Sequence, residues 1–301
     1  MSEVVKVGDI VGRRSYNSDT MFRIEKIVDD TAYLKGIFFR LTADAPVSDL
    51  EVISREEYQR AEQVEFDQYR TILPPVMNQM RSYDNGDFYI SGRILHIDGD
   101  EEYLQKSIKL YKYAKVYAQA FAVQEKDMKT RVPELVKKLR PNIVVITGHD
   151  ALEDKEHEDD LNSYRSSKYF VETVNALREI EPSLDYLVVI AGACQSHFEA
   201  LIGSGANFAS SPKRINIHAL DPAIIAATVA LTPYEEQVDL REAIEKTIAK
   251  IAGIGGLQTK GTLRYGIRKV WKYLILSLLM YNFKCLTHNN IEKNFFLWYA
   301  L

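Results

Sequence analysis

The chain is poor in cysteine, has no excess of positive charge, and begins without the apolar stretch of a secretory signal. Its 301 residues include only 2 cysteines, Cys194 and Cys285, which excludes a disulfide framework and favours a reducing compartment. The formal net charge of −4 provides no basic field for nucleic acid. No group of cysteines and histidines has the spacing of metal ligands. We therefore predict a soluble cytoplasmic protein that needs no metal, cofactor or nucleic acid.

Two further absences narrow the choice of protein class. The chain has no glycine-rich phosphate loop, which argues against a doubly wound nucleotide-binding protein. Its apolar segment at residues 270–283 has only 11 uninterrupted residues between Lys272 and Lys284, whereas a helix needs about 20 to span a bilayer. We expect residues 269–301 to be an atypical hydrophobic tail rather than a membrane anchor.

Residues 1–54 contain short alternating runs separated by Gly, Asn and Asp, the pattern of a small β-domain. The pattern predicts five strands, at residues 9–11, 21–24, 32–34, 38–41 and 50–53. Five strands in so short a segment indicate an SH3-like β-barrel, which would be either a docking module or a structural cap. A charged helical linker is expected over residues 55–90, stopped by Pro74 and Pro75.

From residue 91 to residue 268 the pattern alternates between strands and helices. The expected strands are residues 92–97, 116–123, 143–146, 187–190 and 215–220, and the expected helices lie near residues 104–111, 132–139, 168–180, 196–201 and 221–229. Alternation at this spacing is typical of a parallel sheet covered by helices on both faces. The predicted fold class is therefore α/β.

A histidine and a cysteine each follow one of these buried strands. Cys194 lies 45 positions after His149, a gap that suits one strand–helix–strand crossover. Because the carboxyl ends of parallel strands meet at one edge of a sheet, we expect the two side chains to lie together there. A thiol and an imidazole in that position are candidates for a nucleophile and its general base.

The residues beside these two side chains supply further candidates. Ser196 and Glu199 fit a capping box, which would place Cys194 just before a helix N-terminus and lower the pKa of its thiol. Backbone groups of Gly148, Asp150 and Gly192 are the candidates for holding an oxyanion. The competing interpretation is that Cys194 is a small buried hydrophobe with a structural role.

Two family resemblances follow from these motifs. Ala193-Cys194-Gln195, with the histidine earlier in the chain, resembles the caspase-like cysteine peptidases, although Ser196 and Asp150 stand where those enzymes have glycine. Longer segments resemble the YabG family of sporulation-specific peptidases over about residues 5–267. These segments are residues 7–9, 14–16, 95–100, 146–150, 170–174, 191–199, 205–212 and 216–222.

The resemblance implies a caspase-like peptidase domain over residues 91–268 that processes spore coat and cortex-associated proteins and cleaves after arginine or lysine. It also implies activity in the cytoplasm of the sporulating cell, at the developing spore coat. Caspase-like peptidases line the primary specificity pocket with a residue from the end of the first strand. That position is held here by Asp98 and Asp100, with Asp221 as a third candidate, although Asp100 also fits a helix N-cap.

Two expectations accompany this hypothesis. Self-cleavage is expected in the polar linker, at Arg55, Arg60, Arg70 or Arg81. The alternative function is a non-catalytic module of spore coat assembly, in which the β-domain docks partners and Cys194 is structural.

Overall fold

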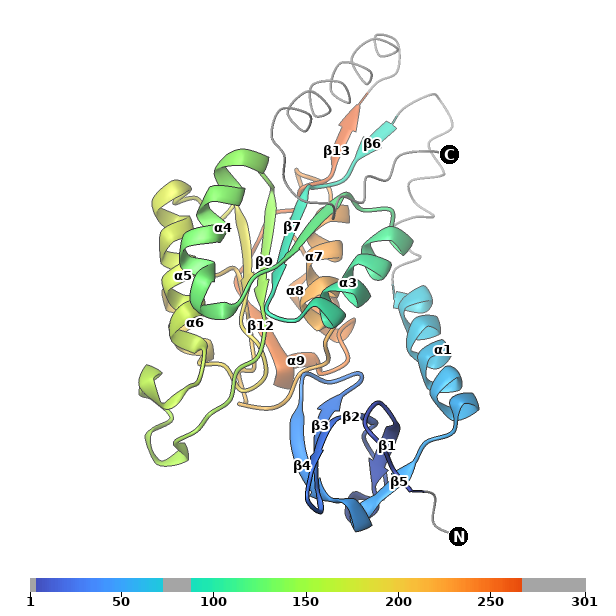
Figure 1. Cartoon of the computed structure of the whole chain (residues 1–301). Coiled ribbons are helices and arrows are strands. Elements are labelled where there is room, and N and C mark those ends of the chain that lie inside the picture. Colours follow the sequence, from blue (N-terminus) through green and yellow to red (C-terminus); the bar gives the residue numbers. More distant parts are fainter. Residues whose placement is uncertain (1–3, 73–87, 267–301) are drawn as a thin grey trace, which may run out of the picture.

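The computed structural model describes residues 4–72 and 88–266, and its N-terminal part is a five-stranded antiparallel sheet (Figure 1). The strands are β1 (Ile10–Arg13), β2 (Phe22–Val28), β3 (Thr31–Gly36), β4 (Thr42–Pro46) and β5 (Leu50–Val52), in the order β4-β3-β2-β1-β5. Alternate residues face one side and form a small core that includes Val11, Phe22, Ile24 and Leu34. The closed SH3-like form stays a prediction.

The fourth strand differs from the sequence-based prediction. Residues 38–41 were expected to form it, but β4 begins at Thr42 and these residues form a loop. Within the loop, Phe39 makes one isolated antiparallel bridge with His218, far along the chain. The alternating apolar pattern of the loop therefore reflects burial against another part of the protein, not pairing within its own sheet.

The larger sheet confirms the predicted α/β class. Its order is β12-β11-β10-β9-β7-β8, and every neighbouring pair is parallel except β11 with β12. The strands are β7 (Ile94–Asp98), β8 (Ala118–Ala122), β9 (Ile143–Thr147), β10 (Val188–Ala191), β11 (Phe208–Ser210) and β12 (Ile254–Gly256). A separate antiparallel pair joins β6 (Phe88–Ile90) to β13 (Arg264–Gly266).

One predicted strand of this sheet is wrong. Residues 215–220 are irregular, and the strand next to β10 is β11, a three-residue segment that the sequence pattern did not separate from its surroundings. Residues 215–220 are instead held by hydrogen bonds to several other loops. The Cys194 thiol meets Ile217, and the bridge to Phe39 engages His218. Apolar content alone did not distinguish this buried loop from a strand.

Helices cover both faces of the larger sheet. One face carries α3 (Glu101–Tyr113), α7 (Asp221–Leu231) and α8 (Leu240–Glu245), and the other carries α4 (Glu125–Leu139), α5 (Ser167–Ile180) and α6 (Phe198–Gly203). A short helix, α9 (Lys250–Gly253), precedes β12. Helix α4 begins at residue 125, seven positions before the predicted start at residue 132, because its polar first turns gave no apolar periodicity. This earlier start brings Glu125 to the carboxyl edge of the sheet.

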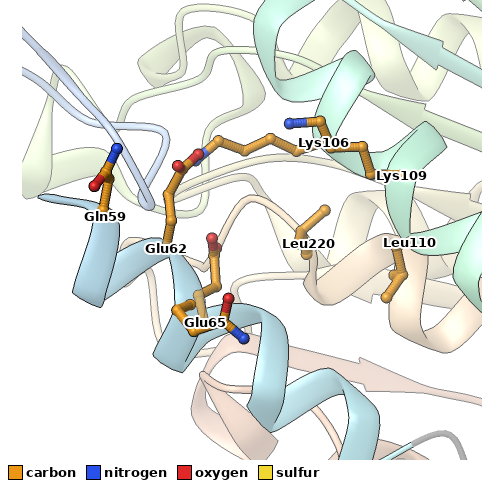
Figure 2. A pocket seen from close by; sticks show the side chains of 8 residues that line it. Gln59, Glu62, Glu65, Lys106, Lys109, Leu110 and Leu220 are labelled. Carbon is orange, nitrogen blue, oxygen red and sulfur yellow. The ribbon is translucent and has the colours of Figure 1, made fainter.

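Helix α1 (Arg55–Ile72) follows the N-terminal sheet and runs beside α3 (Figure 1). Ser54 caps it reciprocally with Glu57, whose backbone N–H donates to the serine hydroxyl at 3.2 Å. A polar pocket lies between α1 and α3, where acids of α1 face lysines of α3 (Figure 2). The predicted proline stop and the hydrophobic tail lie outside the described residues, and the predicted domain boundaries stay predictions.

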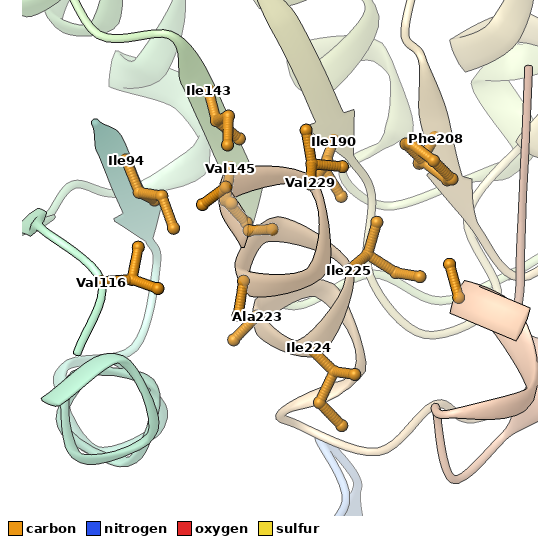
Figure 3. Packing of buried hydrophobic residues seen from close by; sticks show 14 of the residues in the cluster. Ile94, Val116, Ile143, Val145, Ile190, Phe208, Ala223, Ile224, Ile225 and Val229 are labelled. Carbon is orange, nitrogen blue, oxygen red and sulfur yellow. The ribbon is translucent and has the colours of Figure 1, made fainter. Parts of the chain in front are cut away.

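The core of the larger domain follows from alternation along its central strands. In β9, Ile143 and Val145 pack under α7, whereas Val144 and Ile146 pack under α4 and α5. Helix α7 is buried along its whole length, and its apolar side chains meet those of the sheet (Figure 3). Each fully buried Val or Ile contributes about 1.5–3 kcal/mol. This double burial fixes the strand ends that carry the candidate site.

Candidate active site

Three neighbouring strands, β7, β9 and β10, deliver polar groups to one edge of the sheet. Asp98 ends β7, and His149 and Cys194 follow β9 and β10. The register pairs Asp98 with Thr147 of β9 and Ala122 of β8, so the carboxyl ends of the strands are level. This is the edge where open α/β sheets gather ligands and catalytic groups.

Cys194 is buried in a sharp loop after β10. Gly192 adopts a φ of 104°, and a Cβ there would lie 2.8 Å from a methyl group of Leu201, so the loop requires glycine. The Cys194 thiol accepts a hydrogen bond from the backbone N–H of Ile217 at 3.3 Å. Burial raises the pKa of the thiol to about 11, although the Ile217 amide and the nearby Arg40 oppose this effect.

The predicted helix cap beside Cys194 is wrong. Helix α6 begins at Phe198, its N-cap is His197, and Glu199 pairs with Arg214 instead of reaching back to Ser196. Because the helix starts four residues after Cys194 and the thiol is buried, the predicted lowering of its pKa does not occur in this structure.

Hydrogen bonds to Asp150, in place of the predicted helix cap, hold the loop that carries Cys194. Its carboxylate accepts hydrogen bonds from the hydroxyl of Ser196 at 2.8 Å, from the hydroxyl of Ser167 at 2.5 Å, and from the backbone N–H of Ser166 at 2.7 Å. Ser196 in turn accepts the N–H of Ala193 at 2.9 Å. Burial raises the pKa of Asp150, and these hydrogen bonds oppose the rise. The side chain that replaces the family glycine therefore braces the histidine loop against the cysteine loop.

The backbone groups expected at an oxyanion site fall into two classes. The N–H of Gly192 donates to the carbonyl of Ile146 at 3.0 Å and is occupied by the sheet. The N–H groups of Gly148, Asp150 and Cys194 have no acceptor among the residues that the structure describes. The N–H of Gly192 is therefore not available to an oxyanion in this structure, whereas the other candidates are open, and the oxyanion site stays a prediction.

His149 is partly buried at the same edge. Its Nε2 lies 3.7 Å from a carboxylate oxygen of Asp100, and its backbone N–H donates to Glu125 at 2.7 Å. Burial lowers the pKa of His149, the charge of Arg40 lowers it further, and the carboxylates of Asp100, Glu125 and Asp98 oppose both effects. No hydrogen bond joins the His149 ring to the Cys194 thiol among residues 4–72 and 88–266.

Glu125 is a site residue that the sequence analysis missed. Its carboxylate lies under the histidine loop so closely that a Cβ on Gly148 would come within 2.2 Å of it, so a larger residue at position 148 would displace Glu125. Its Oε1 is also 4.0 Å from His149 Nδ1. The missed signal was an acidic residue in the first turn of a helix whose start was placed too late.

Arg40 is the second missed residue, and it comes from the N-terminal domain. Its Nη1 and Nη2 donate to the two oxygens of Asp98 at 2.8 and 2.5 Å, and both side chains are fully buried. The guanidinium also lies over the ring of Tyr103, 4.7 Å from its centroid. Burial lowers the pKa of Arg40, but Asp98 more than compensates and leaves it above its ordinary value. A bidentate pair of this kind is specific for arginine over lysine.

The other two acids predicted for the specificity pocket have different partners. Asp100 caps α3 by accepting the N–H of Glu102 at 2.9 Å, and it pairs with Lys35 at 2.6 Å. Asp221 accepts the backbone N–H groups of residues 248, 249 and 218, and burial raises its pKa. Of the three acids, Asp98 is the one whose two oxygens receive a guanidinium.

Two general features of the described residues complete the description of the site. No group of side chains suited to a metal ion occurs in the described ranges, and none of the helices described is both long and apolar enough to cross a bilayer.

The family model for the YabG peptidase U57 matches residues 6–268. The sporulation-specific protease YabG of Bacillus subtilis (strain 168) is 41% identical over 282 residues, which cover 87% of this chain and 97% of that protein. The resemblance inferred from the motifs is thus confirmed, and this chain belongs to the YabG peptidase family U57.

Proposed function

We propose that this protein is a cysteine endopeptidase of sporulation that cleaves after arginine, with Cys194 as nucleophile and His149 as general base. Membership of a peptidase family and likeness to a sporulation-specific protease support the general class. The cysteine class, the Cys–His pair and the preference for arginine are parts of the proposal. So are the caspase-like and SH3-like forms of the two domains.

One observation carries the proposal. An arginine of this chain, Arg40, lies with its guanidinium on both oxygens of buried Asp98, while its backbone N–H and its charge act to lower the pKa of the Cys194 thiol. A substrate arginine before the scissile bond needs the same two neighbours, a carboxylate for its side chain and a nucleophile beside its main chain. Asp98 is therefore the pocket acid of the proposal.

The reaction then follows ordinary thiol peptidase chemistry. His149 takes the thiol proton, and the sulfur attacks the carbonyl carbon of the substrate arginine. The C–N bond breaks, the leaving amine takes the proton from His149, and water hydrolyses the thioester. The N–H groups of Asp150 and Cys194, which have no acceptor among the described residues, are available to hold the oxyanion.

The buried state of Cys194 favours one alternative, a non-catalytic module of spore coat assembly with a structural cysteine. In both functions the proposed partners are proteins of the spore coat and cortex, met in the cytoplasm of the sporulating cell. The two functions differ in whether the Cys194 thiol is needed for a catalytic activity.

The test uses the purified full-length protein and peptides that differ only in the residue before the cut, namely arginine, lysine and norleucine. We expect cleavage that prefers arginine, is abolished in Cys194→Ala, and is unchanged in Cys285→Ser, the matched control at the second cysteine of the chain. Equal cleavage by Cys194→Ala and the wild type would reject the cysteine peptidase, and absence of cleavage by both would leave the assembly module.

A further inference from the structure

The loop at residues 37–41, called here the Arg40 loop, lies in the candidate active site and not in its own sheet. Phe39 pairs with His218 in an antiparallel bridge, and the N–H of Ala219 donates to the carbonyl of Phe38 at 3.0 Å. Peptides that bind by strand addition make the same main-chain contacts. The loop therefore lies where the substrate residues before the cut are expected to bind.

The burial of Arg40 is hard to explain as a means of stabilising the fold. Its side chain and that of Asp98 have no exposed surface, and its Nε is buried without a hydrogen-bond partner in the structure described. Replacing a buried ion pair by apolar residues is often neutral or stabilising, so such a pair is weak evidence for stability. A pocket built to receive a guanidinium explains the pair better.

The loop also acts on both proposed catalytic groups. The Arg40 N–H and charge act on the Cys194 thiol, and the same charge acts on His149. With the loop in place, Cys194 is 2% exposed and its thiol makes hydrogen bonds with Ile217, not with the imidazole. Water and substrate are kept from the nucleophile.

The loop is bent in a way that a substrate is not. The N–H of Leu41 donates to the carbonyl of Phe39 at 2.8 Å, which closes a three-residue turn on Arg40. The hydroxyl of Tyr103 donates to the carbonyls of Gly36 and Phe39 at 2.6 and 2.9 Å and fixes the turn from α3. Peptides bound by strand addition are extended, so the bond after Arg40 is not presented for cleavage.

We infer that the Arg40 loop is a built-in pseudosubstrate: it fills the arginine pocket at Asp98, covers Cys194 and keeps most molecules of the peptidase inactive until it is displaced. This inference rests on the proposed function and adds its regulation. Contacts at the rim set how firmly the loop is docked. Lys106 donates to the carbonyl of Ile37 at 2.6 Å, and Lys35 pairs with Asp100 and Glu102 at 2.6 and 3.2 Å.

The test compares full-length wild type with Arg40→Gln and with Arg14→Gln. Arg14 is an exposed arginine of the same domain whose partners, Leu50 and Glu51, are far from the site, so it is the matched control. We expect Arg40→Gln to raise kcat/KM for an arginine peptide about tenfold or more, because apparent activity scales with the fraction of open molecules. Arg14→Gln should match the wild type. The inference would be overturned if the wild type shows Cys194-dependent cleavage and a folded Arg40→Gln variant is no more active than the wild type.

Two further measurements cover the remaining outcomes. If Arg40→Gln does not fold, Lys106→Met loosens the loop without touching the pocket, so a rise in activity supports the inference and an unchanged activity rejects it. The rate of iodoacetamide labelling of Cys194, followed by peptide mass spectrometry, separates the two proposals. Faster labelling in Arg40→Gln without any peptide cleavage would support the covering role of the loop and reject the peptidase, whereas unchanged labelling would reject the covering role.

Discussion

The hydroxyl of Ser196 donates to the carboxylate of Asp150 at 2.8 Å, and this bond joins the loops that carry the candidate nucleophile and base. Both residues are buried, and together they form a polar network between the two loops. The same carboxylate holds Ser166 and Ser167 at the start of α5. The two loops therefore keep a fixed separation.

The first prediction concerns this network. Asp150→Ala should lower the free energy of unfolding by about 2–4 kcal/mol, because it leaves several buried donors without an acceptor. It should also lower kcat more than it raises KM, since the cysteine loop loses its brace. Asp154→Ala, at an exposed acid of the same connection, is the control and should leave the free energy of unfolding close to that of the wild type. Urea unfolding and peptide kinetics measure both effects, and an equal loss in the two variants would contradict the prediction.

The second prediction concerns the Cys–His pair. Cys194→Ala, His149→Ala and the double variant should lose nearly the same rate, because residues that act as one catalytic unit are not additive. His157→Ala, at an exposed histidine of the same loop, should keep wild-type activity. Multiplicative losses in the double variant would show that the two side chains act separately.

The third prediction concerns specificity. Asp98→Asn should reduce the preference for arginine over norleucine by about a hundredfold, the loss expected when one partner of a buried charge pair is removed. Asp221→Asn should keep the preference, because the Asp221 carboxylate is engaged by backbone amides. Competition between the two peptides, with products measured by mass spectrometry, provides the ratio. Full preference in Asp98→Asn together with its loss in Asp221→Asn would move the pocket to Asp221.

The fourth prediction concerns pH and His96, a fully buried residue of β7 whose Nδ1 lies 2.8 Å from the Tyr111 hydroxyl. Burial, with a smaller contribution from Arg40, lowers its pKa from 6.5 to about 3. Between these values the unfolded chain binds more protons than the folded protein, so His96 destabilises the fold as pH falls below about 6.5. The free-energy gap between wild type and His96→Gln should shrink by about 2 kcal/mol from pH 7.5 to pH 5. Urea titrations at the two pH values measure it, and a constant gap would mean that His96 is not buried in its neutral form.

The fifth prediction is self-cleavage in the linker. Fragments ending at Arg55, Arg60, Arg70 or Arg81 should appear in the wild type at high concentration and be absent from Cys194→Ala. The first three positions lie in α1, which must unwind to enter an extended site, so cutting there should be slow. Arg81 lies outside the described residues. Mass spectrometry identifies the fragments, and the same fragments in both proteins would indicate a contaminating protease.

Sequence reasoning located the larger sheet well because its buried strands are near-continuous apolar runs, such as residues 143–146 and 187–190. Those runs also placed His149 and Cys194 at one edge. The same reasoning failed for residues 38–41, whose alternation resembles a strand although its cause is contact with a segment some 180 positions away. The capping box at Ser196 failed for a related reason, since Asp150 competes for the serine hydroxyl. Periodicity reports local burial and cannot identify a distant partner.

In the proposed regulation, the Arg40 loop is covalently part of the enzyme that it blocks. This attachment determines under which conditions activity can arise. A tethered ligand acts at an effective concentration that can reach the millimolar range, and dilution of the protein does not change it. A lone arginine peptide at micromolar concentration competes poorly against such a tether. A dense layer of assembling protein, which presents many arginines close to one enzyme, can reach a comparable local concentration. The proposed regulation would thus favour cleavage within an assembled layer over cleavage of the same proteins free in solution.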